Sequence, residues 1–201
     1  MNRFSEFDFG LSWIMTQFHQ DWLLDADTAA GLVAKYLAHP AEQDVVAVRR
    51  DAVALLEKLP SNTLEVLWDA GAEYLPSRRL IGTGTEWTAK VVELCDARLS
   101  TMANVPVLSA ADTEDGWGHS DAVIAEIEAT QSLAADVRAG LIDCARLCAP
   151  ELAFRLLLRV MVVDRVTSLT PERYARLEAI GADLHYGEFV VDNVRFLIDS
   201  E

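Results

Sequence analysis

The chain of 201 residues lacks the disulfide framework of a small secreted domain and the long apolar segment of a membrane protein. Its three cysteines, Cys95, Cys144 and Cys148, are an odd number without the spacing of a disulfide framework, which agrees with a reducing compartment. The N-terminus lacks the apolar core of a signal peptide. The densest apolar run, 156–163, falls far short of the ~20 residues of a membrane span. We therefore expect a cytoplasmic protein that no helix anchors in a membrane.

Motifs for catalysis and metal binding are also missing. No pair among the four histidines has the spacing of metal ligands: His19, His39, His119 and His185. His19 and Asp21 are not the adjacent His-Asp pair that metal-dependent phosphohydrolases need, and the further ligands are lacking. Residues 82–85 alternate glycine and threonine, but no lysine follows them and no strand precedes them, as a phosphate loop requires. We expect no metal and no cofactor, and an enzyme is disfavoured.

Basic residues are scarce. Seventeen lysines and arginines face 32 aspartates and glutamates, which gives a formal net charge of -15. A surface this acidic repels nucleic acid and anionic lipid and attracts basic proteins. We therefore expect no direct binding to nucleic acid or membrane, whereas a basic protein partner fits the charge. The alternative is that the acidity serves solubility alone.

Alternation of period two is absent, so the sequence predicts no strands. Apolar residues instead recur at spacings of three and four, which predicts an all-α fold of about nine to ten amphipathic helices in one or two packed bundles. The run 151–166 is predicted to be the central buried helix of the second half. Four helix starts carry capping signals: Asp25 or Asp27, Asn62 with Glu65, Thr83 with Glu86 (or Thr85), and Thr170 before Pro171.

The helical pattern lapses at residues 106–120, which are acidic, glycine-bearing and without period. We predict a helical domain over 1–105, an acidic linker or loop over 106–120 and a second helical subdomain over 121–201. The first ten residues are predicted to be a loosely attached arm. Trp117 is either an anchor folded back onto the body or an exposed contact for a partner. The anchor is favoured, because large apolar side chains are seldom left in water.

The most distinctive stretch is Phe18-His19-Gln20-Asp21-Trp22, at the end of the first predicted helix. An ordered pattern follows it: acids at Asp25 and Asp27, helices ending before Pro40 and Pro60, and Trp87 opening a further helix. Over roughly residues 10 to 100 this pattern resembles the immunity proteins of contact-dependent growth inhibition systems.

The resemblance implies a function. Such a protein would bind the toxic domain of a cognate effector inside the producing cell and block its active site or substrate groove. Those toxins are often nucleases, whose basic surfaces would attract this acidic chain. We interpret Phe18 to Trp22 as structural and place the partner-binding residues among exposed acids and one aromatic: Asp25, Asp27, Asp112, Glu114, Asp115 and Trp117. The alternative is a helical adaptor or regulator that presents a groove to a partner helix or peptide.

Overall fold

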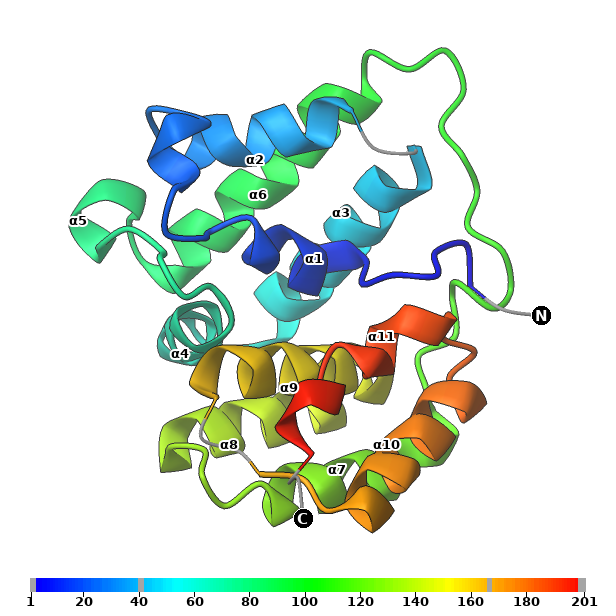
Figure 1. Cartoon of the computed structure of the whole chain (residues 1–201). Helices are drawn as coiled ribbons and strands as arrows, with labels where there is room; N and C mark the ends of the chain where they lie inside the picture. Colours follow the sequence, from blue (N-terminus) through cyan, green and yellow to red (C-terminus); the bar gives the residue numbers. More distant parts are fainter. Residues whose placement is uncertain (1–2, 40–41, 166–167, 199–201) are drawn as a thin grey trace. The chain divides into compact units, whose positions relative to one another are not determined.

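The structure, a computed structural model, describes residues 3–39, 42–165 and 168–198 (Figure 1). Within these ranges it contains eleven α-helices, and its single isolated β-bridge joins Leu169 to Ile198. The predicted all-α fold is therefore confirmed. None of the helices in the described ranges is long and apolar enough to cross a membrane.

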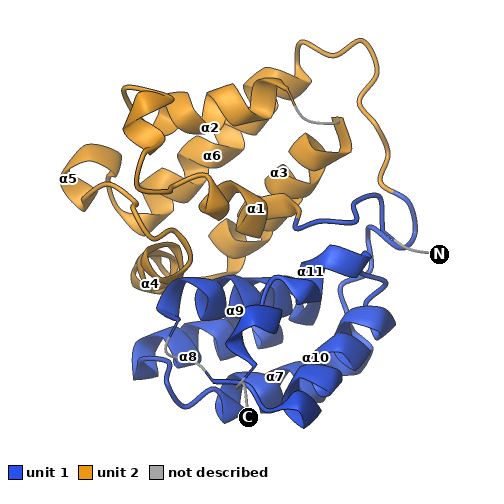
Figure 2. Ribbon diagram, in the orientation of Figure 1, with its two compact units in different colours: residues 1–8, 109–201 blue, residues 9–108 orange. Residues whose placement is uncertain are grey.

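The chain forms two compact units (Figure 2). Unit 2 comprises residues 9–108, and unit 1 joins residues 1–8 to residues 109–201. Unit 2 is thus an insertion in the chain path of unit 1. The sequence had assigned residues 1–8 to the first domain and 106–120 to a linker, whereas 1–8 and 109–120 both belong to unit 1.

Arg3 explains why the N-terminal segment belongs to unit 1. Its side chain is buried, and its guanidinium donates hydrogen bonds to the backbone oxygens of Leu184 (2.9 Å), Asp112 (3.1 Å) and Glu114 (2.7 Å). The backbone N–H of Phe4 donates to Asp112 Oδ1 at 2.8 Å. A buried guanidinium needs acceptors of this kind, and the carbonyls of unit 1 supply them. The segment is an ordered part of unit 1 and not the loose arm that the sequence suggested.

The described residues of unit 2 form six helices and one 3-10 turn: α1 (Gly10–Thr16), η1 (Trp22–Leu24), α2 (Ala29–Ala38), α3 (Glu42–Lys58), α4 (Ser61–Gly71), α5 (Arg78–Ile81) and α6 (Gly84–Leu99). Helix α6 packs against α2, α3 and α4, while α1 packs against α3 and α4. The buried side chains of α6, Trp87, Val91 and Cys95, recur at steps of four and place one face of the helix in the core.

The helix starts of unit 2 agree only partly with the predicted caps. Thr83 and Glu86 form the predicted capping box at α6. At α2 the capping side chain is Thr28, whose hydroxyl accepts the N–H of Gly31, and neither Asp25 nor Asp27. Pro60 precedes α4 without a side-chain cap, so the prediction of Asn62 with Glu65 is wrong. Both errors are shifts of one or more residues, which spacing alone does not resolve.

Unit 1 contains five α-helices and three shorter helical turns: η2 (Trp117–His119), α7 (Ser120–Ala129), α8 (Ala135–Asp143), the π-helical turn η3 (Cys144–Cys148), α9 (Pro150–Asp164), α10 (Pro171–Asp183), α11 (Glu188–Asp192) and η4 (Arg195–Leu197). Helix α9 packs against α7, α8 and η3. Eleven of its 15 residues are buried, so the predicted central helix is confirmed. The hydroxyl of Thr170 accepts the N–H of Arg173 and caps α10, as predicted.

The π-helical turn was not predicted. The spacing of four residues between Cys144 and Cys148 predicts one regular helix that ends at Pro150, with both cysteines in the core. In the structure the N–H of Ala149 donates to the oxygen of Cys144 at 3.1 Å, a bond that spans five residues. The wider turn rotates the following side chains, so Cys144 is buried whereas Cys148 is half-buried.

Candidate functional site

An apolar hollow of about 950 Å³ lies within unit 2. Its lining residues are Gln20, 22–23, 27–30, 73–76 and 80–81, with Trp87 and Lys90. These segments are the turn after α1, the start of α2, the loop after α4, helix α5 and the first turns of α6 (Figure 1). The volume is at the upper end of the range typical of ligand-binding clefts, roughly 300–1,000 Å³. The hollow therefore has room for several side chains of a partner.

A chain of aromatic rings fixes the floor of the apolar hollow. Trp22 and Trp87 line it, and Phe18 packs edge-on against both, with ring centroids 5.9 Å and 6.1 Å apart. Trp68 extends the chain, because its ring lies 5.7 Å from that of Trp87. Edge-to-face contacts of this kind contribute about 0.5–1.5 kcal/mol each beyond the burial of area. The floor is thus a rigid part of the unit 2 core.

The Phe18–Trp22 turn is bonded to the loop that forms the facing wall. Trp22 Nε1 donates to the backbone oxygen of Tyr74 at 3.0 Å, and the N–H of Tyr74 donates to the oxygen of Phe18 at 3.2 Å. Within the turn, His19 Nδ1 accepts the N–H of Asp21 at 3.2 Å. The rings are buried and the polar residues His19, Gln20 and Asp21 are exposed. The signature therefore positions one wall of the hollow.

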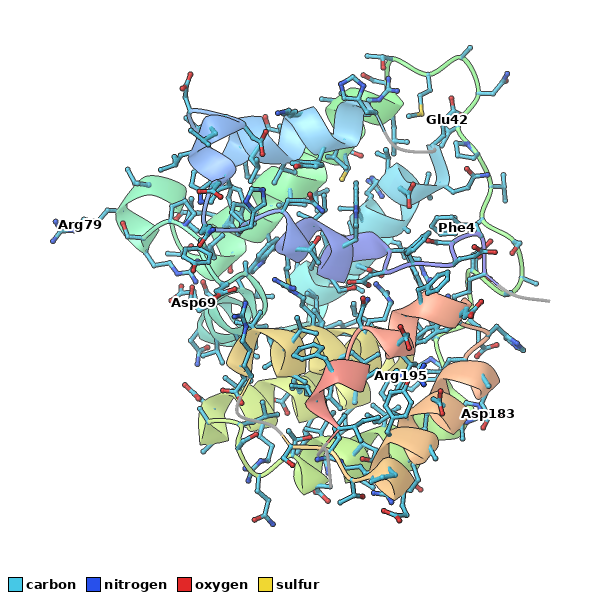
Figure 3. The ribbon with its side chains drawn as sticks, viewed as in Figure 1. Phe4, Glu42, Asp69, Arg79, Asp183 and Arg195 are labelled. Atoms are coloured by element: carbon cyan, nitrogen blue, oxygen red, sulfur yellow. The ribbon has the colours of Figure 1, made fainter. Side chains whose placement is uncertain are left out.

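Large apolar side chains stand exposed at the mouth of the hollow. Leu23 is 63% exposed, Leu80 79% and Tyr74 44%. Leu80 belongs to α5, a four-residue helix without a buried residue. Helix α5 is held by Arg78, which donates to the oxygen of Glu65 and to Asp69, while Arg79 extends away from the body of the unit (Figure 3). A cluster of exposed apolar side chains rimmed by polar groups marks an interaction site.

Acidic groups border the hollow. Asp27 and Glu73 are exposed lining residues. Asp27 has no hydrogen-bond or ion-pair partner within the described ranges. The Lys90 ammonium lies 2.9 Å from a carboxylate oxygen of Glu93, so its charge is offset. The hollow therefore presents a negative border around an apolar interior.

Asp25 lies close by but is already engaged. Lys35 Nζ donates to Asp25 Oδ1 at 2.8 Å, and His19 Nε2 lies 3.5 Å from Oδ2. The hydrogen bond from Lys35 and the charges of Lys35 and His19 lower the pKa of the Asp25 carboxyl. Asp25 is thus a carboxylate that braces the turn before α2, whereas Asp27 faces the hollow.

Trp87 has a buried donor without an acceptor. The side chain is 2% exposed, and its indole N–H meets no hydrogen-bond acceptor within the described part of the chain. The neighbouring Trp68 differs, because its Nε1 donates to Thr88 Oγ1 at 3.0 Å. A buried N–H without an acceptor costs about 1–3 kcal/mol, so this indole N–H lowers the stability of the unit 2 core.

The remaining predicted partner-binding residues lie on unit 1. Asp112 is buried, and its carboxylate accepts the N–H groups of Phe4 (2.8 Å) and Ser109 (2.9 Å). The expectation that Asp112 is an exposed recognition residue is therefore wrong, because the N-terminal segment covers it. Glu114 is exposed and Asp115 half-buried.

Trp117, in η2, is 50% exposed, so the structure makes it neither fully an anchor nor fully a free contact. Of the six predicted residues, two belong to unit 2 and four to unit 1.

Unit 1 also contains a buried polar cluster. Glu151 and Arg155 are each 1% exposed and share two hydrogen bonds of 2.6 Å and 3.0 Å. Tyr186 Oη donates to Glu151 Oε1 at 3.0 Å. Burial raises the pKa of the Glu151 carboxyl, but Arg155 outweighs it and the net pKa lies below the usual range. The polar groups of this cluster form hydrogen bonds with one another. The cluster therefore holds α9 in place and is no candidate for ligand binding.

Sequence reasoning missed Leu23, Tyr74 and Leu80. Residues 77–85 read as a polar turn, and a four-residue helix has no amphipathic period to reveal. The pair Leu80-Ile81 inside an otherwise polar stretch was the available signal. Among the residues that the structure describes, no group of three or more histidine, cysteine, aspartate or glutamate side chains is placed to hold a metal ion.

Comparison of the chain with models of protein families, with curated proteins and with solved structures found no match. The resemblance of residues 10–100 to immunity proteins of contact-dependent growth inhibition therefore stays a prediction.

Proposed function

We propose that this chain is an immunity protein, which binds the toxic domain of a cognate bacterial effector in the cytoplasm and neutralises it. It acts by covering the toxin's active site or substrate groove and performs no reaction of its own. The observation that carries the proposal is the apolar hollow, at whose mouth Leu23, Tyr74 and Leu80 are exposed. The hollow lies within residues 10–100, where the sequence pattern resembles that family.

Charge supports a basic partner. Unit 2 carries thirteen acids against eight lysines and arginines, and unit 1 carries nineteen against nine. Toxins that act on nucleic acid have basic surfaces, and opposite charges speed the encounter of two proteins. Association should therefore slow steeply as the ionic strength rises, while the dissociation rate changes less.

A helical adaptor that binds a peptide of another kind of partner is the second candidate, and the same hollow favours it. The position of the gene separates the two functions. A reading frame directly downstream of a large secreted toxin supports immunity, whereas a place among metabolic genes supports the adaptor.

The decisive experiment is coexpression of the neighbouring toxin domain with and without this chain. Cells should survive with the chain and die without it, and the two purified proteins should form a complex. A catalytically inactive variant of the toxin provides the control for expression. If cells die equally in both cases, the immunity function is wrong for that pair.

A further inference from the structure

We infer that the apolar hollow takes a segment of the partner that carries aliphatic side chains and at least one lysine or arginine. The inference deepens the proposed function and rests on it, since the segment would belong to the toxin domain. Two features of the hollow specify these two properties of the occupant: its exposed leucines and the carboxylates at its border.

The aliphatic requirement follows from the walls. Leu23 and Leu80 are 63% and 79% exposed, and both line the hollow above the floor of Trp22 and Trp87. Covering these leucines stabilises a complex by removing apolar surface from water, provided that the covering groups are apolar. A polar occupant would gain none of this.

The cationic residue follows from the border. Asp27 is exposed and has no partner within the described ranges, and Glu73 lies on the border as well. The nearest lining cation, Lys90, is offset by Glu93. A lysine or arginine at the edge of the segment would pair with Asp27, and an acidic segment would be repelled.

The test measures binding of the neighbouring toxin domain to full-length variants. Leu80→Asp and Leu23→Asp should raise the dissociation constant about 30-fold or more, as expected for central apolar contacts. Leu147→Asp is the matched control, because Leu147 is 50% exposed on unit 1 and lies outside the hollow. It should bind as the wild type does. Unchanged binding by Leu80→Asp, or equal weakening by the control, would overturn the inference.

Folding of the variants can be checked independently. Leu80 sits on a helix without buried residues, so its substitution should leave the far-ultraviolet circular dichroism and the thermal midpoint unchanged. Leu80→Ser provides a milder variant with the same expected direction. Asp27→Lys should weaken binding and reduce its dependence on salt, whereas Asp27→Asn should do so less.

The two proposals can fail separately. If the toxin domain does not bind, the immunity function fails, and the hollow is then probed with a displayed library of short random peptides. The selected peptides should be rich in leucine, isoleucine and valine, contain a lysine or arginine, and lose binding to Leu80→Asp. Acidic peptides, or peptides that bind Leu80→Asp equally well, overturn the inference. If the Leu80→Asp variant neutralises the toxin as well as the wild type does, the immunity function is supported and the inference is overturned.

Discussion

The buried pair of Glu151 and Arg155 lets the contribution of one buried charge to the free energy of unfolding be measured. Both side chains are 1% exposed, so removing the carboxylate leaves the guanidinium buried with less compensation. We expect Glu151→Gln to lower the free energy of unfolding by about 3–5 kcal/mol. Glu93→Gln is the control, because it breaks the exposed pair with Lys90 and should leave stability unchanged. Urea unfolding measures both, and equal losses in the two variants would contradict this role of the buried pair.

The same carboxyl predicts a pH dependence. Burial raises its pKa but Arg155 lowers it further, so the folded-state pKa lies below that of the unfolded chain. The pair therefore contributes its full stability above the unfolded-state pKa, about 4.3, and loses it as the pH falls through the folded-state pKa. The midpoint of thermal unfolding, measured between about pH 3 and 7, should fall more steeply with decreasing pH in the wild type than in the Glu151→Gln variant. Parallel curves would show that other carboxyls govern the acid limb.

The three cysteines should differ in reactivity. Burial, with the charge of Asp96, raises the pKa of the Cys95 thiol to about 12, so almost none of it is thiolate near pH 8. Cys144 is buried and Cys148 half-buried. Iodoacetamide should therefore modify native protein at Cys148 first, as mass spectrometry of timed samples would show. Cys148→Ser should abolish the fast phase, and early labelling of Cys95 would be inconsistent with its burial.

At the scale of elements, the start of α6 matters because this helix packs against α2, α3 and α4. The Thr83 hydroxyl accepts the N–H of Glu86, and the Glu86 carboxylate accepts the N–H of Thr83. Thr83→Ala should lower the free energy of unfolding by about 1 kcal/mol. Thr85→Ala, an exposed neighbour whose hydroxyl makes no bond within the described ranges, is the control. Thermal or urea unfolding of the isolated variants decides between them, and equal effects would exclude capping as the cause.

The elements that sequence reasoning predicted are those whose signals are local. The residues that make up each of these signals lie within a few positions of one another. The signals are the apolar stripe and capping box of α6, the apolar run of α9 and the Thr170-Pro171 start of α10. The elements it missed depend on distant partners or on a change of helical period. Helix α5 has no buried face of its own, and the hydrogen bond of η3 spans five residues instead of the four of a regular helix.

The candidate site was predicted only in part for the same reason. Of the distinctive stretch at residues 18–22, Gln20 and Trp22 line the apolar hollow. The facing wall comes from Tyr74 and Leu80, more than fifty residues away in the chain, and no local pattern pairs them with Trp22. Asp112 looked like a surface acid because its partner, Phe4, is 108 residues distant.

For the whole molecule, the chain path predicts an unusual outcome of proteolysis. Val105 and Val107 are 51% and 92% exposed, so thermolysin should cut at residues 105–108. The N-terminal fragment then keeps Arg3, whose guanidinium remains bonded within unit 1. The two fragments should therefore migrate together under native conditions and separate only in denaturant.

Arg3→Ala tests this explanation, because it removes three hydrogen bonds that join the N-terminal segment to the rest of unit 1. The nicked variant should release its fragments on size-exclusion chromatography, whereas nicked Arg79→Ala, altered at an exposed site, should not. Fragments of the wild type that part at once after cleavage would show that these bonds do not hold the segment.

The separation between Arg3 and its acceptor at Leu184, 181 positions along the chain, also sets an order in time. A ribosome adding about 5–20 residues per second takes on the order of 10 s or more to deliver the second after the first. Residues 9–108 can acquire their native packing during that interval, while the opening segment waits without its acceptors. Newly made molecules should thus pass through a stage in which unit 2 is folded while unit 1, whose two segments flank it in the sequence, is not yet folded.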